Sequence, residues 1–206
     1  MLQSRPLRWV LGGLAVVLLL GIGYVGGLIT PTLTAPGNNS PEAGFARDMS
    51  THHAQAVSMG LLEIENGQNP DIKGLAHEIV TAQQAEIGTM QEWLTEWHLL
   101  PTSDQRRMAW MPGPPVQIVN GLMPGMASTA EMNELTTTTG KAEDILFCQL
   151  MLRHHEGGIH MAEGIIELTG NSEVKALAQS MVAGQQAEIL DLTNYLKQLG
   201  AAPLTS

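Results

Sequence analysis

One pattern of aromatic, methionine and histidine residues occurs twice in this chain. Residues 45–59 read F-x-x-x-M-x-x-H-H-x-x-x-x-x-M, and residues 147–161 repeat that pattern at an offset of 102 residues, from Phe45 to Phe147. The same offset carries residues 83–87 (QQAEI) onto residues 185–189 without a gap. Two copies are too few for a solenoid, so the duplication predicts two equivalent units that face each other about a pseudo-twofold axis.

Apolar periodicity predicts that each unit is a helical hairpin. Ser40 and Pro41 form a helix start, and that helix is expected to reach about residue 65; a second helix runs from Asn69-Pro70 to near His98. The second copy predicts helices over 141–170 and 172–200. Strand-like alternation is sustained nowhere, so we expect an all-α, four-helix bundle over 41–200, with repeat 1 at 42–98 and repeat 2 at 141–200.

The connection between the repeats, residues 99–140, is rich in methionine, proline and glycine. Ser128-x-x-Glu131 is the capping box of a short helix. Met-x-x-Met occurs at 108/111 and again at 123/126. Met123 and Met126 have two interpretations, as accessory ligands for a soft metal ion or as side chains that fill gaps around Trp110.

Residues 1–30 are predicted to be a transmembrane signal anchor. Arg5 and Arg8 precede an uncharged apolar run at 9–29, which is long enough to span a bilayer, and no convincing cleavage site follows it. Residues 31–40 have the composition of a flexible tether. We therefore expect a periplasmic or other extracytoplasmic domain held at the inner membrane, with secretion after cleavage as the alternative.

After this leader the chain holds eight basic and twenty acidic residues. Such an acidic surface disfavours nucleic acid as a partner and attracts cations. The lone Cys148 cannot form an internal disulfide and is predicted to be a small buried residue.

The two histidine pairs and their flanking methionines are the predicted metal ligands. Residues three or four apart share one helical face, so each copy presents imidazoles and thioethers together. The ligands are Met49, His52, His53, Met59, Met151, His154, His155 and Met161. This soft, neutral set favours copper, Cu(I) before Cu(II), over magnesium or calcium. The alternative is a set of core histidines bonded to carboxylates, and a joint site is favoured over two separate ones.

Other residues are predicted to act around these ligands. A ligating imidazole commonly donates its second N–H to a carboxylate or amide, a role predicted for Gln83, Glu86, Gln185 and Glu188. Glu42 and Asp144 are equivalent positions near helix starts, where a carboxylate interacts with the helix dipole. His160 is an accessory ligand at most.

The spacing of the histidines and glutamates does not match the catalytic metal motifs of zinc proteases or di-iron carboxylate enzymes. His155-Glu156 is followed by His160, one residue too late for H-E-x-x-H, and no Glu has a His three residues later, as di-iron carboxylate bundles require. We therefore expect a non-catalytic protein that buffers or relays copper. A redox enzyme using the same residues and a metal-free, partner-binding bundle are the alternatives.

The chain resembles a known family, domain of unknown function 305. The resemblance rests on the Met123-Pro-Gly-Met126 turn, on Asp144-x-x-Phe147-x-x-x-Met-Leu-Arg-His-His, and on Gln83-x-x-Glu86 in the first copy, and it covers roughly residues 41–200. It implies a ferritin-like four-helix bundle, copper homeostasis with other exported copper-handling proteins as partners, and metal binding by the eight residues above. The chain departs from the family pattern at Glu42, usually Asp, and at Leu192, where the first copy has Met90. The second departure predicts that the two halves bind metal with unequal strength.

Overall fold

The computed structural model describes residues 16–21, 23, 24, 35–113, 116, 118 and 120–204. Most of the predicted membrane anchor and residues 31–34 of the tether lie outside these residues. Residues 16–21, 23 and 24 are helical. Among the residues that are described, no helix is both long and apolar enough to cross a membrane.

After residue 40, the structure has a helix at each place that the sequence predicts. The four long helices are α2 (Pro41–Asn66), α3 (Pro70–Glu96), α5 (Lys141–Leu168) and α6 (Ser172–Leu199), and the described residues contain no strand. Each helix start except that of α5 has a side-chain cap, such as Ser40, whose hydroxyl accepts a hydrogen bond from Ala43 N. The short α4 (Thr129–Thr137) has the predicted capping box between Ser128 and Glu131.

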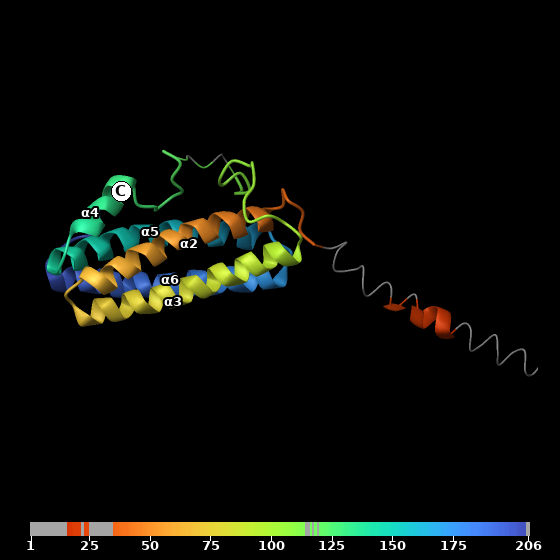
Figure 1. Ribbon diagram of the computed structural model, residues 1–206, viewed down its shortest axis with the longest axis horizontal. Helices are drawn as coiled ribbons and strands as arrows, with labels where there is room; N and C mark the ends of the chain where they lie inside the picture. The colour runs from red at the N-terminus through yellow and green to blue at the C-terminus, as the bar shows by residue number, and fades with distance from the viewer. Residues whose placement is uncertain are drawn as a thin grey trace, which may run out of the picture. The chain divides into compact units, whose positions relative to one another are not determined.

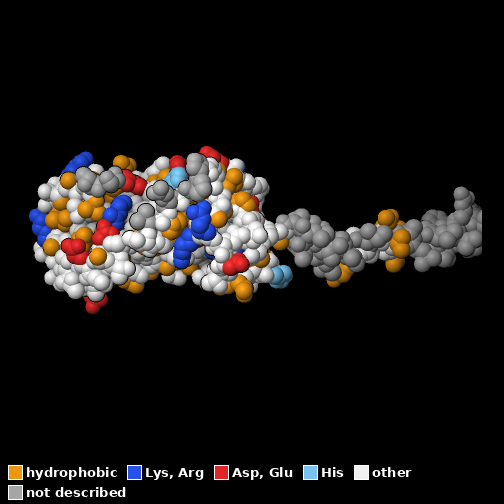
Figure 2. Space-filling view, turned by 90° about the horizontal axis from the view of Figure 1, so that it is seen from above, with side chains coloured by type: hydrophobic (Ala, Val, Ile, Leu, Met, Phe, Trp, Pro, Cys, Tyr) orange, Lys and Arg blue, Asp and Glu red, His pale blue; other side chains and the backbone are white. Residues whose placement is uncertain are grey.

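Two hairpins pack side by side in one bundle (Figure 1). α2 packs along α3 and α5 along α6, while α2 and α5 form the main contact between the hairpins. α4 and the connection before it lie on the α2/α5 side, where α4 touches both helices. Seen from that side, the surface carries acidic, basic and hydrophobic side chains together (Figure 2).

The equivalent carboxylates Glu42 and Asp144 each reach across to the other hairpin. Asp144 Oδ1 accepts hydrogen bonds from the backbone N–H of Gln68, at 2.8 Å, and of Asn69, at 3.1 Å. Glu42 Oε1 accepts a hydrogen bond from Thr169 Oγ1 at 2.8 Å. These reciprocal contacts are what a pseudo-twofold axis between α2 and α5 requires. Both carboxylates lie ten residues, about 15 Å of helix, from their histidine pair, so they hold loops and do not approach the imidazoles.

The core has two parts, one toward each end of the bundle. The methionine-rich end is built around Phe45 and contains six buried methionines. They are Met49, Met90, Met108, Met123, Met161 and Met181. The aliphatic end is built around Phe147 and Leu192 and contains only Met59 and Met151 as buried methionines among the described residues. Cys148 is buried there, as predicted.

Three buried carboxyl groups lie close together at the aliphatic end: Glu63, Glu143 and Asp144. Burial, followed by repulsion from Asp144 and Glu143, raises the pKa of Glu63 to about 9. Burial and the nearby Asp144 raise the pKa of Glu143 to about 7. The position equivalent to Glu63 in repeat 2 is the buried Ile165, so the carboxyl cluster has no counterpart at the methionine-rich end.

The compact unit begins before the predicted tether ends. It extends from Gly37 onward, because the half of the tether nearest α2 is bonded to the bundle. Arg47 Nη1 donates to Asn38 O at 3.0 Å and Arg47 Nη2 to Asn38 Oδ1 at 2.8 Å, while Arg47 Nε donates to Leu100 O. One guanidinium thereby joins the tether to the start of the connection.

Candidate metal centre

The seven histidines divide by burial. The four of the two pairs, His52, His53, His154 and His155, are at most 1% exposed. His77, His98 and His160 are exposed. His160, predicted as an accessory residue, therefore lies on the surface, away from the buried imidazoles.

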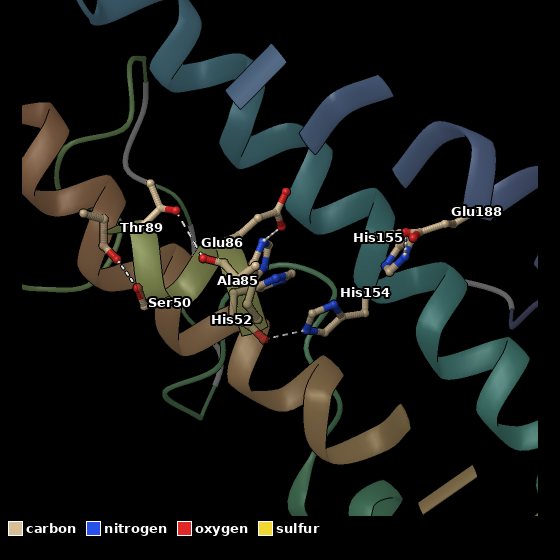
Figure 3. A network of polar contacts seen from close by, with 10 residues as sticks. Ser50, His52, Ala85, Glu86, Thr89, His154, His155 and Glu188 are labelled. Atoms are coloured by element: carbon tan, nitrogen blue, oxygen red, sulfur yellow. Dashed lines mark hydrogen bonds and ion pairs between the residues drawn. The ribbon is translucent and has the colours of Figure 1, made fainter. Parts of the chain in front are cut away.

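His52 and His154 meet between α2 and α5. Their ring centroids are 3.8 Å apart and the rings are tilted by 32°. His154 Nε2 donates to the backbone oxygen of His52 at 3.0 Å, across the helix contact (Figure 3). His52 Nε2 donates to Pro124 O, in the connection, at 3.1 Å. The duplication thus brings the first histidine of each pair into direct contact, and we call the two rings of His52 and His154 the stacked pair.

The second histidine of each pair turns toward the other helix of its own hairpin. His53 Nε2 lies 2.8 Å from Glu86 Oε2, and His155 Nε2 lies 2.6 Å from Glu188 Oε2. Figure 3 shows Glu188 reaching His155 in this way. Each carboxylate fixes a ring's orientation and favours the tautomer with its proton on Nε2.

All four imidazoles keep the same nitrogen unused. The Nδ1 atoms of His52, His53, His154 and His155 are buried and have no hydrogen-bond partner among the described residues. Since Nε2 is a donor in every case, Nδ1 is the nitrogen that bears the lone pair. A buried lone pair without a partner is costly for a purely structural histidine, and it is the group that a metal ion would use.

The environment keeps the stacked pair neutral. Burial, together with repulsion from His53, lowers the pKa of His52 to about 3 despite the hydrogen bond to Pro124. Burial and the neighbouring His52 and His155 hold the pKa of His154 well below its usual value. Neutral imidazole is the form that can ligate a metal.

The four predicted thioether ligands are fully buried, and each end of the core contains one from each repeat. Met49 of repeat 1 and Met161 of repeat 2 belong to the methionine-rich end, whereas Met59 and Met151 belong to the aliphatic end. Because α2 and α5 are related by the pseudo-twofold, the thioethers at each end of the histidine layer come from both repeats.

Gln83 and Gln185 are buried at matched positions, but they do not bond the imidazoles. Among the described residues, the side-chain amide of Gln83 has no hydrogen-bond partner at either its nitrogen or its oxygen. Oε1 of Gln185 also has none. Gln185 instead packs against Gly158, where a Cβ would collide with its amide oxygen. The orienting contacts in this structure come from Glu86 and Glu188.

A segment of the connection covers the stacked pair. We call residues 123–128 the strap. Gln55 makes two hydrogen bonds with the backbone of Ala127. Gln55 Nε2 donates to Ala127 O at 2.9 Å, and Ala127 N donates to Gln55 Oε1 at 2.7 Å. At the equivalent position in α5, Gly157 has no side chain, and the Pro124 carbonyl occupies the place of its Cβ. The strap therefore lies directly on α2 and α5.

An ion pair ties α4, the helix that follows the strap, to α5. Arg153 of α5 binds Glu131 of α4 through two hydrogen bonds of 2.8 and 2.9 Å. That contact lowers the pKa of Glu131 to about 2. Sequence reasoning missed the strap contacts of Gln55, Gly157 and Pro124, although one signal existed: position 157 departs from the repeat by having glycine opposite Gln55.

A site made of His, Cys, Asp and Glu alone is tested by the arrangement of these side chains. Within the described part of the chain, no three His, Cys, Asp or Glu side chains are arranged to hold a metal ion together. The methionines that flank the histidine pairs in the sequence are buried in the two parts of the core.

The fold and this buried layer define a duplicated four-helix bundle with a histidine–methionine core. The family model for DUF305, a domain of unknown function, matches residues 42–196. The chain belongs to the DUF305 family. None of the curated proteins matches it.

Three solved structures describe its likeness to known proteins. A DUF305 protein from Streptomyces coelicolor, named as a candidate secreted protein, is 38% identical, with a TM-score of 0.76 over 82% of this chain and all of that one. A DUF305 fragment from Deinococcus radiodurans is 29% identical, with a TM-score of 0.66 over 79% of this chain and 99% of the other. CopM in its Cu(I)-bound form is 22% identical, with a TM-score of 0.58 over 77% of this chain and 96% of CopM; at that identity the likeness concerns the fold.

Proposed function

We propose that this protein binds copper, with preference for Cu(I), and buffers or relays it without making or breaking bonds in a substrate. The observation that carries the proposal is the stacked pair of His52 and His154. Two neutral imidazoles from the two repeats are buried together, each with an unpartnered Nδ1, between clusters of buried thioethers.

The chemistry of the donors favours this metal. Thioether sulfur and imidazole nitrogen are soft to borderline neutral ligands, which suit Cu(I) and leave hard divalent cations poorly coordinated. Glu86 and Glu188 would keep the second histidines in the tautomer that offers Nδ1. CopM, whose fold is similar, has been solved with Cu(I), Cu(II) and silver, and Ag(I) is the usual soft stand-in for Cu(I).

We place this activity outside the cytoplasm. The apolar run at 9–29 after Arg5 and Arg8 supports export, and so does the name of the Streptomyces relative, a candidate secreted protein. In this proposal the leader stays attached as an anchor, which mass analysis of the native protein tests directly. A mature chain that always begins after residue 30 would overturn the anchor and leave export intact.

The test of copper binding is a competition titration of the purified protein against a Cu(I) chelator under anaerobic, reducing conditions. The parent is expected to retain copper and to exclude zinc at equal free metal. Replacing His52 and His154 by alanine should remove the tightest binding. Replacing the exposed His77 and His160 by alanine is the matched control and should leave it unchanged. Equal loss in both variants, or no stoichiometric copper in the parent, would refute the proposal.

A further inference from the structure

The stacked imidazoles are closed off from solvent, so a metal ion needs a route to them. His52 is fully buried and His154 is 1% exposed. On the α2/α5 side their cover is the strap, because Pro124 accepts the hydrogen bond from His52 Nε2. Any ion that arrives from this side must pass the strap.

A cavity opens to the surface beside the strap. It has a volume of about 310 Å³, and its wall includes Met123, Met126, Glu131 and Arg153. Met123 is 2% exposed and Met126 is half-buried. Met126 therefore lies on the solvent side of the cavity and Met123 on the core side. The residue after Met123 is Pro124, the hydrogen-bond partner of His52. The cavity and the imidazole pair are therefore separated by a single peptide segment.

The charges around the cavity do not oppose a cation. Arg153 is neutralised by its two hydrogen bonds to Glu131. Glu131 remains a carboxylate, because the same contact lowers its pKa to about 2. With that pair internally balanced, the soft donors of the cavity wall are the two sulfurs of Met123 and Met126, beside oxygen donors such as Asn120 and Ser128. Thioether sulfur favours a soft cation such as Cu(I) over hard divalent cations.

We propose that Met123 and Met126 form a transient binding site for a soft monovalent cation, through which Cu(I) reaches the buried imidazoles of His52 and His154. This inference rests on the proposed function and adds its route of uptake. The ion binds first at Met126 and moves to Met123. Displacement of the strap then breaks the bond between Pro124 and His52 and opens the imidazole layer. The two hydrogen bonds between Gln55 and Ala127 set how easily the strap moves.

The test is the rate at which Cu(I) transfers from a chromophoric chelator complex to the full-length protein, followed by absorbance. Replacing both Met123 and Met126 by leucine keeps the volume and removes the sulfur. Transfer is expected to slow by at least about tenfold, while the copper content at equilibrium stays as in the parent. Met132→Leu is the matched control, because Met132 is a half-buried methionine of α4 that does not line the cavity; it should transfer copper at the parental rate.

Loosening the strap should have the opposite effect. Gln55→Ala removes both hydrogen bonds to Ala127 and is expected to speed uptake several-fold. If the double variant does not keep its helical content, Met126→Leu alone, at a half-buried position, gives the decisive rate.

The outcomes separate the two claims. A parental rate in the leucine variants would overturn the route, and so would a loss of equilibrium affinity equal to the loss of rate, since the sulfurs would then be permanent ligands. Absence of copper in the parent itself would instead overturn the proposed function.

Discussion

The two repeats present the same imidazoles and the same orienting carboxylates, yet they are covered differently. His53 with Glu86 and His155 with Glu188 are close copies of each other. The first histidines differ: His52 donates to the strap and His154 donates to His52. The duplication therefore gives a symmetric set of imidazoles and carboxylates, and the single connection covers the two repeats differently.

The largest effect is expected from removing either histidine pair. If both repeats contribute to one site, His52→Ala with His53→Ala and His154→Ala with His155→Ala should each weaken the tightest Cu(I) binding by at least about 100-fold, beyond what the loss of an orienting partner causes. Chelator competition measures the affinity. Two separate sites would instead leave one parental site in each variant.

Folding must be followed in the same samples. Removing buried, partnered imidazoles can also destabilise a bundle, so helical content by circular dichroism is compared with that of the parent. Helical variants that both bind copper like the parent would show that these histidines are not ligands.

The next effect concerns position 157, where repeat 2 has glycine and repeat 1 has Gln55. Gly157→Ala should destabilise the protein by about 2 kcal/mol, because the added Cβ collides with the Pro124 carbonyl of the strap. Gly184→Ala is the matched control: Gly184 lies in α6 with open space around it, so alanine should stabilise by about 0.5 to 1 kcal/mol through helix propensity. Denaturant unfolding checks both; stabilisation by both substitutions would mean that the strap does not rest on α5.

Much of the fold could be predicted from the sequence, because helix signals are local. Ser40-Pro41 and the Ser128–Glu131 capping box act within one turn, and both stand where predicted. The offset of the repeat also placed Glu86 and Glu188 at matched positions. Their contact with His53 and His155 is a structural finding, and the metal roles of these residues stay predictions.

The features that could not be predicted from the sequence are contacts between segments that are far apart in the chain. The strap bonds Pro124 to His52 and Ala127 to Gln55, across 72 residues in both cases. No local pattern encodes such a contact. The same holds for Gln83 and Gln185, which were predicted as candidates to orient imidazoles. Both are buried, and among the described residues the side-chain contacts to His53 and His155 come from Glu86 and Glu188, three residues further along each helix.

A smaller effect is expected from the carboxylates that orient the second histidines. Glu86→Gln and Glu188→Gln should each weaken copper binding by about tenfold, since a neutral amide holds the imidazole less firmly and makes it less basic. The two values should agree closely, because this contact is the symmetric part of the site. A large difference between them in titrations would show that only one repeat engages the metal through its second histidine.

The smallest effect is a dependence of stability on pH, which comes from Glu63 at the aliphatic end of the core. Folding raises the pKa of Glu63 from 4.5 to about 9, so between these values the folded state binds more protons than the unfolded state. Stability is lost as pH rises through this window. Glu63→Gln should reduce the loss between pH 6 and 9 by on the order of 1 kcal/mol. Parallel stability curves for parent and variant would show that Glu63 is ionised in the folded protein at neutral pH.

The central claim is that imidazoles and thioethers from both repeats hold one soft ion in the bundle core. X-ray absorption spectroscopy at the copper edge, on the protein loaded with one equivalent of Cu(I), tests this claim most directly. The account predicts a first coordination shell with both imidazole nitrogen and sulfur, and loss of the imidazole signal when His52, His53, His154 and His155 are all replaced by alanine. A shell of nitrogen and oxygen alone, or an imidazole signal that survives those substitutions, would contradict it.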